Sequence, residues 1–361
     1  MVTIIIATII PFALLFLIYR LDLYASGSFQ LVIISFIWGG LSVSIALFIA
    51  NQLLFNVESI NLTAYSNTGA PIIEELLKAV LLIVFVYQAR LTYFVDGAIY
   101  GFAIGIGFAI IENTIYLSNS PELVTAMGRV FSTNLMHATA TGLVGITLGY
   151  AQFDRFSGRI FWLILGLLLA IVIHAGFNNL VSMLNGRFIF VYATASGLVG
   201  LAFIIFMIKR GLAEQKRWIE ESLAVSNRIT EGETAVVQRL DHVYDILTPL
   251  AVQFGPQKAQ KIEAFLMLQA RLGILQKSSQ NIKDEKMRRG VETQIETLLQ
   301  EIDAARRLVG PYCMIYLRSV FPTHTSPLWH QLEQKINHHQ KKPSGVNIWK
   351  TLAERTDSAS G

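Results

Sequence analysis

The sequence contains a single cysteine, Cys313, and few charged residues. One cysteine cannot form an internal disulfide and matches no cysteine spacing of a metal site. Only 15% of the 361 residues are charged, whereas a soluble domain usually carries about 25%. The net charge of +4 is explained by basic cytoplasmic loops and a basic tail. We therefore expect a membrane protein with no nucleic-acid partner.

The N-terminal stretch MVTIIIATIIPFALLFLIYR lacks both a basic start and a small-residue cleavage site. These are the features of a secretory signal peptide, so we interpret the stretch as a retained first span. Long apolar runs fill residues 1–208, and most charges fall in residues 209–361. The sequence therefore predicts an all-α fold in three parts: a polytopic membrane helical bundle (1–208), a cytoplasmic α-helical region (209–335) and a disordered tail (336–361).

Crossing a bilayer takes about 20 mostly apolar residues. About seven spans are predicted, at residues 2–19, 31–54, 71–89, 95–117, 130–151, 160–183 and 188–208. Lys and Arg are more frequent in the loops after the odd-numbered spans and after the last span. The positive-inside rule then predicts a multi-pass protein of the cell membrane, with its N-terminus outside and its C-terminus in the cytoplasm.

Ionisable residues inside spans must be sheltered from lipid, so each is a functional-site hypothesis. In the predicted orientation they fall on four successive spans and all in the outer half of the membrane. We therefore expect these spans to share one hydrophilic cavity. The residues concerned are Glu74, Glu75, Lys78, Glu112 with Asn113, His137, and His174 with Asn178.

Spacing within the spans supports this interpretation. Glu74 and Lys78, like His174 and Asn178, are four residues apart and share a helix face. Asn134, His137, Thr141 and Gly145 form one polar, small face of the fifth span. A separate stripe on the fourth span is predicted to serve helix packing alone; it consists of Gly97, Gly101, Gly105 and Ala109.

Each polar residue also has a structural interpretation. Acidic residues at a helix start are favoured by the helix dipole. A single His or Asn in a span often only joins neighbouring helices by a hydrogen bond. The coincidence of all these residues at one depth favours the cavity.

Four motifs in this region resemble the PrsW family of intramembrane proteases, within the larger group of CAAX-prenyl endopeptidases and Abi-type proteins. They are EELLK, GFAIIEN, a span with a histidine, and HAGFN, between residues 70 and 180. The wider group usually has a histidine four residues after the phenylalanine that corresponds to Phe108. This chain has Glu112 there, as PrsW-like sequences do. Residues 209–361 carry no part of the resemblance.

The resemblance implies an intramembrane endopeptidase in the lipid bilayer that cleaves membrane-anchored proteins, such as anti-sigma factors. It also implies a glutamate-dependent mechanism. One of Glu74 and Glu75 would activate water, helped by Glu112 or His137. Two adjacent carboxylates in a low-dielectric site do not both ionise easily, so one can act as base while the other holds a proton or orients its neighbour. The sequence does not decide which is the base.

The remaining residues of the cavity receive supporting roles. His174 and Asn178 would bind the developing oxyanion from one helix face. Lys78 would balance the local negative charge, and Asn113 would line the cavity beside Glu112. A peptidase needs such groups because water, oxyanion and leaving amine must all be stabilised.

Two alternatives stay open. The first is a metal-dependent protease with Glu75, Glu112, His137 and His174 as zinc ligands. It is less favoured because the chain lacks HExxH and any closely spaced ligand pair on one helix, so we expect no cofactor. The second is a non-catalytic scaffold or transport protein. A transporter more often has inverted repeats and broken helices, and a degenerate scaffold would be expected to lose motif residues.

The polar part predicts further helices. Residues 209 to about 247 would extend the last span until Pro249 and the pair Gly255-Pro256 interrupt it. Apolar residues spaced by three and four predict amphipathic helices at 257–278 and 283–309. A self-packed hairpin is favoured over pairing with another chain, and the sequence does not define the oligomeric state. His338 and His339, in the predicted tail, are weak evidence for a metal site.

Overall fold

The computed structural model describes residues 2–24, 27–56, 61–119, 123–184, 187–224, 243–311 and 313–314. All regular secondary structure within these residues is helical, which confirms the all-α prediction. The membrane part contains α1 (Val2–Arg20), α2 (Phe29–Asn56), α4 (Ala70–Tyr87), α5 (Phe94–Asn119), α6 (Leu123–Phe131), α7 (Thr133–Ala151), α8 (Phe156–Met183) and α9 (Arg187–Ala224).

Seven of these helices correspond to the seven predicted spans. Five of them, α1, α2, α5, α8 and α9, are long and apolar enough to cross a membrane. The other two are α4, which carries three charged residues, and α7, which is rich in threonine and glycine. Both of these helices are among the four that carry the predicted cavity. The predicted span 130–151 differs in detail, because Ser132 separates α6 from α7.

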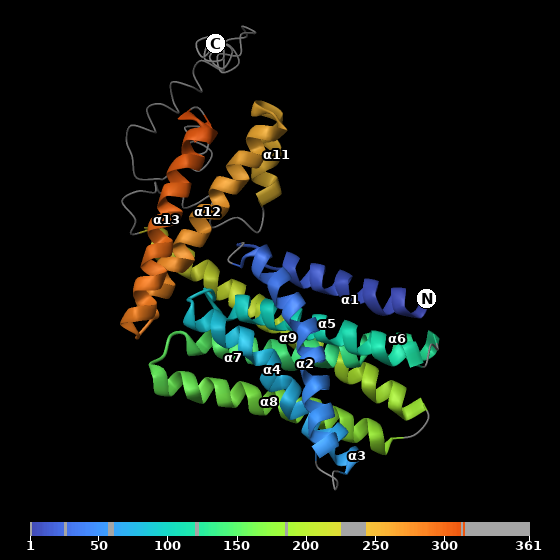
Figure 1. Ribbon diagram of the computed structural model, residues 1–361. Helices are drawn as coiled ribbons and strands as arrows, with labels where there is room; N and C mark the ends of the chain where they lie inside the picture. Colours follow the sequence, from blue (N-terminus) through green and yellow to red (C-terminus); the bar gives the residue numbers. More distant parts are fainter. Residues whose placement is uncertain are drawn as a thin grey trace, which may run out of the picture.

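α5 and α7 form the buried centre of the bundle, with the other membrane helices around them (Figure 1). The glycine stripe of α5 packs directly on the α7 backbone, as predicted. A Cβ at Gly101 would lie 2.3 Å from the carbonyl oxygen of Thr141, and one at Gly105 would lie 2.4 Å from that of His137. Only glycine allows this approach, so the stripe fixes the depth of His137 relative to α5.

A short helix, α3 (Leu62–Ala64), and a π-helical turn, η1 (Tyr65–Gly69), lead into α4. The Asn61 side chain caps α3 by accepting hydrogen bonds from the backbone N–H groups of Thr63 and Ala64. Pro71 lies in the first turn of α4, where its missing N–H costs nothing. Because α4 begins at Ala70, Glu74 and Glu75 lie in its second turn.

Three helices follow the membrane part: α11 (Val243–Phe254), α12 (Pro256–Asn281) and α13 (Glu285–Val309). α12 and α13 confirm the two predicted helices, and they pack together as a hairpin (Figure 1). The predicted one-sided apolar pattern holds for α13, whereas α12 buries residues on several faces, including the run 272–275. The predicted interruption at Pro249 is wrong, since this residue lies inside α11. Gly255, with φ +86°, separates α11 from α12 as predicted. The predicted tail, with His338 and His339, lies outside the described residues.

Candidate active site

Four helices bring the predicted polar residues into one cluster. The helices α4, α5, α7 and α8 each contribute, and contacts run from α4 and α5 to α7 and α8. We call these six side chains the polar cluster: Glu74, Glu75 and Lys78 from α4, Glu112 from α5, His137 from α7 and His174 from α8.

Glu75 lies at the centre of the polar cluster and its side chain is fully buried. Its Oε1 accepts hydrogen bonds from Lys78 Nζ at 2.8 Å and from His174 Nδ1 at 2.9 Å. Its Oε2 accepts one from the hydroxyl of Thr141 at 3.3 Å. A buried carboxylate is tolerable only when it is paired and hydrogen-bonded in this way. Glu75 is therefore held rigidly, with three partners on two other helices and its own.

Lys78 and Glu112 fix the tautomer of His137. The Lys78 ammonium, which can only donate, lies 2.9 Å from His137 Nδ1. The ring proton is therefore assigned to Nε2, which lies 2.9 Å from Glu112 Oε2. Lys78 Nζ also lies 3.8 Å from the ring centroid of Phe108, a favourable position for a cation. Both nitrogens of His137 are thus engaged.

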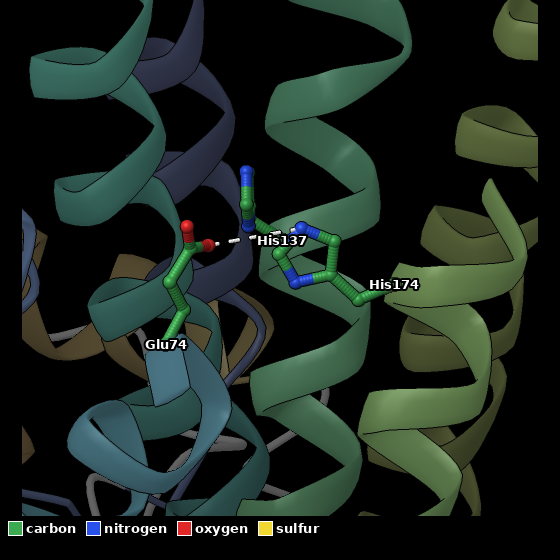
Figure 2. A group of neighbouring side chains, drawn as sticks. All are labelled: Glu74, His137 and His174. Carbon is green, nitrogen blue, oxygen red and sulfur yellow. Dashed lines mark ion pairs between the residues drawn. The ribbon is translucent and has the colours of Figure 1, made fainter. Parts of the chain in front are cut away.

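His174 links Glu75 to Glu74. Its Nδ1 contacts Glu75, and its Nε2 lies 3.7 Å from Glu74 Oε2. Figure 2 shows the Glu74 carboxylate directed toward both imidazoles. The two rings meet edge to face, with centroids 4.6 Å apart.

The polar cluster has one accessible edge. The side chains of Glu112 and Glu74 are 38% and 18% exposed, whereas the other four are 4% exposed or less. A reacting group therefore reaches the cluster from the side of these two carboxylates.

The structure places the other two predicted residues beside the cluster. Asn113 is buried and donates a hydrogen bond to Asn134 Oδ1, while its own Oδ1 accepts one from Arg129. The Asn178 side chain does not reach the cluster through any contact found among the described residues. Its Nδ2 donates to the carbonyl oxygen of Ser66 in η1, at 3.2 Å. One turn beyond His174, the face of α8 meets η1 instead of the cavity.

Arg129 contacts the site although its position in the sequence suggested only a loop charge. Its Nη2 lies 3.6 Å from Glu112 Oε1, and its guanidinium lies over the Tyr116 ring at 4.1 Å. Nothing in the spacing signals this contact, because it depends on how α6 folds back against α5. Thr141, by contrast, lies on the polar face of α7 that the sequence had already indicated.

Three residues of the polar cluster lie close enough together to bind one metal ion. Glu74, His137 and His174 offer ligand atoms that all lie within 4.8 Å of one another. Two imidazoles and one glutamate form the donor set of a common class of catalytic zinc site. The residues therefore fit a metal ion in type and spacing, with Glu74 as the carboxylate ligand in place of the predicted Glu75 and Glu112.

Glu75 and Glu112 would not bind the ion in such a site but would orient the histidines that do. Metal-bound histidines usually hydrogen-bond a carboxylate through their other nitrogen, and Glu75 and Glu112 contact His174 and His137 in this manner. One condition applies: for His137 Nδ1 to bind an ion, the ring must first release Lys78.

A bundle of membrane-spanning helices that holds glutamates and histidines in mutual contact defines a polytopic membrane protein with a hydrolase-type site. A protein-family model described as "PrsW family intramembrane metalloprotease" matches residues 27–208. The chain therefore belongs to the PrsW family of intramembrane proteases and is a peptide hydrolase.

Individual relatives of the chain also carry the name of this family. The chain is 31% identical over 186 residues to "Protease PrsW" of Shouchella clausii, an alignment covering 50% of this chain and 85% of that protein. It is 28% identical over 208 residues to "Protease PrsW" of Bacillus subtilis, covering 57% of this chain and 90% of that protein. No solved structure matches the chain.

Proposed function

We propose that this chain cleaves a membrane-anchored protein within or beside the bilayer, using water activated by a glutamate of the polar cluster. The observation that carries this proposal is the set of contacts that joins Glu75, His174 and His137 across three helices. Such fixed geometry is what general acid–base catalysis requires. The family membership supports the reaction, and the geometry supports the roles given below.

Glu74 is the best candidate for the base. Glu75 is fully buried and has three hydrogen-bond partners, so it cannot easily approach a water molecule. Glu74 is partly exposed, and its 3.7 Å distance from His174 Nε2 is too long for a hydrogen bond. Both atoms can therefore bind the reacting water. Glu75 then acts by holding His174 in the tautomer that directs Nε2 to this position.

The positive groups beside the cluster stabilise negative charge as the peptide carbonyl is attacked. Lys78 is buried behind Glu75, and Arg129 lies at the accessible edge beside Glu112. After attack, Glu74 can pass its proton to the leaving amine. Asn178 stays a prediction as an oxyanion donor, and in that role it would have to release the Ser66 carbonyl oxygen.

A metal-dependent form of the same reaction is the second candidate. It is favoured by the close approach of Glu74, His137 and His174 and by the description of the family. A bound Zn²⁺ supplies a Lewis acid and makes a bound water more acidic. In that case Glu75 and Glu112 would orient the two histidine ligands.

We further propose that the N-terminus lies outside the cell and the C-terminus in the cytoplasm. Arg129 lies in one of the predicted outer connections, but it binds Glu112 and Asn113 instead of remaining a free loop charge. The outer side thus has even less unpaired positive charge than the sequence suggests, which supports this orientation under the positive-inside rule.

A comparison of membrane proteomes tests the reaction. Cells with the Glu75→Gln chain should accumulate one or more single-span proteins that cells with the native chain process. Glu285→Gln, an exposed change on α13, is the matched control and should behave like the native chain. Equal processing by the native and Glu75→Gln chains would refute the proposed protease mechanism.

Chelation separates the two mechanisms. The accumulated single-span protein, tagged at both ends, serves as the reporter for the purified enzyme. The glutamate mechanism predicts unchanged cleavage after 1,10-phenanthroline treatment. Loss of cleavage that Zn²⁺ restores would instead assign the metal-dependent form.

A further inference from the structure

The α12–α13 hairpin lies beyond the residues that the family model matches, yet it packs on one end of the membrane bundle (Figure 1). At this end it meets two loops: the α4–α5 loop (residues 88–93) and the α7–α8 loop (residues 152–155). These loops join the four helices that carry the polar cluster. The hairpin therefore contacts both halves of the site's framework at once.

Polar bonds attach the hairpin to the α4–α5 loop. The hydroxyl of Ser278 donates to the carbonyl oxygen of Thr92 at 3.1 Å, and both residues are buried. Gln294 Nε2 donates to the carbonyl oxygen of Ala89 at 2.9 Å. A Cβ added to Gly290 would lie 3.6 Å from the Ala89 Cβ, so the two backbones are close here.

Ion pairs attach the hairpin to the α7–α8 loop and to the start of α8. Lys283 donates its backbone N–H to the carbonyl oxygen of Phe153 at 3.2 Å, and its Nζ lies 2.6 Å from Asp154 Oδ1. Asp284 pairs with Arg159 of α8 at 3.1 Å. Asp154 also accepts a hydrogen bond from Trp162 at 3.0 Å, which connects the pair to α8.

The contacts of the polar cluster explain why this attachment matters. Glu75 to His174, Lys78 to His137 and Glu112 to His137 each join the α4–α5 pair to the α7–α8 pair. Any relative shift of the two pairs would separate these groups. A misplacement of about 1 Å can cost about 100-fold in rate.

We propose that the α12–α13 hairpin is a positioning brace, which aligns the two helix pairs by binding both of their loops from the end opposite the site. Lys283, Asp284 and Gln294 are positioning residues in this device. The inference rests on the proposed role of the polar cluster, but the docking of the brace can be tested without any assay of cleavage.

A disulfide tests the docking. Ala89→Cys with Gly290→Cys, in a Cys313→Ala background, places two cysteines at a Cβ separation suited to a disulfide. We expect this pair to cross-link in native membranes on addition of an oxidant. Ala89→Cys with Arg289→Cys is the matched control, because Arg289 is exposed on the neighbouring position of α13. Absence of the 89–290 cross-link would overturn the docked arrangement.

Charge reversal tests the function of the brace. The side chains of Lys283 and Asp154 are 61% and 30% exposed, and such a solvent-accessible ion pair contributes little by itself. The test therefore creates repulsion instead of merely removing a charge. Lys283→Glu should lower cleavage of the tagged reporter at least about tenfold, at an unchanged amount of protein in the membrane. Lys286→Glu, an exposed change of the same charge on α13, is the control and should leave cleavage unchanged.

The cross-link should then rescue the defect. In the Lys283→Glu chain that also carries the cysteines at 89 and 290, oxidation should restore cleavage and reduction should abolish it again. Cleavage by Lys283→Glu at the control level would refute the brace, as would failure of a formed cross-link to restore activity. Failure of the proposed function would appear differently, as normal cleavage by Glu75→Gln.

Discussion

Lys78 occupies a position in which a positive charge is both costly and necessary. Its ammonium is fully buried between Glu75 and His137 and against the Phe108 ring. Removing one partner of a buried ion pair leaves an uncompensated charge, whereas removing both is often tolerated. Stability and catalysis can therefore be separated at this position.

Lys78→Met should destabilise the protein by about 3–5 kcal/mol and abolish cleavage of the reporter, because Glu75 loses its counter-charge. The double variant Lys78→Met with Glu75→Gln should recover much of the stability and none of the activity. Thermal unfolding in detergent measures the first effect and reporter cleavage the second. Additive losses of stability in the double variant would contradict the ion pair.

The two adjacent glutamates should respond differently to the same change. Glu74→Gln and Glu75→Gln should both abolish cleavage, the first through loss of the base and the second through loss of the partner of His174. Only Glu75→Gln should also lower the unfolding temperature, since it leaves Lys78 buried without a carboxylate. If Glu74→Gln retained normal cleavage, the assignment of Glu74 as the base would be wrong.

At the scale of elements, the α5–α7 contact sets the geometry of the site. Gly105 has no room for a side chain, because a Cβ would lie 2.4 Å from the carbonyl oxygen of His137. Gly176 on α8 offers a matched contrast, with nothing within 4 Å of its added Cβ. A side chain is therefore excluded at Gly105 by the α7 backbone, whereas the space beside Gly176 can hold one.

Gly105→Ala should separate α5 from α7, lower stability by about 1–3 kcal/mol and reduce cleavage, because it displaces His137. Gly176→Ala should be neutral or stabilise by up to about 1 kcal/mol. Thermal unfolding and reporter cleavage check both variants. Equal effects of the two substitutions would argue against a close α5–α7 contact.

The sequence predicted the elements better than their contacts. The spans and the shared depth of Glu75, His137 and His174 followed from hydropathy, loop charge and helical spacing, which are local properties. The engagement of Asn178 by η1 and of Glu112 by Arg129 did not follow, because each depends on the path of the chain outside the spans. The same limit applies to the docking of the hairpin, whose partners lie more than 100 residues apart, as at Gln294 and Ala89.

For the whole molecule, the attachment of the hairpin should depend on pH. The hydrogen bond from Lys283 holds the pKa of Asp154 below its ordinary value, helped by Trp162 and Arg159. The backbone N–H of Met287 and the charge of Arg159 likewise lower the pKa of Asp284. A lowered carboxyl pKa stabilises the docked state above the ordinary Asp value and loses this effect as the pH falls through the lowered pKa.

The stability of the docked hairpin should therefore be constant between about pH 6 and pH 8. It should fall below about pH 4, near the ordinary pKa of aspartate. Spin labels on cysteines at the exposed positions Gln88 and Arg289 measure this as a distance distribution that broadens in acid. Asp154→Asn with Asp284→Asn should remove most of the change between pH 6 and pH 3. A distribution that broadened equally in this variant would assign the effect to other groups.

The polar cluster lies near one end of the bundle: Glu74 is in the second turn of α4, and His174 is in the last third of α8. A substrate helix lying parallel to these helices would therefore be divided unequally. One product would be a short stub that leaves the bilayer readily. The other would keep most of the apolar span, so it would remain anchored until a different enzyme removed it.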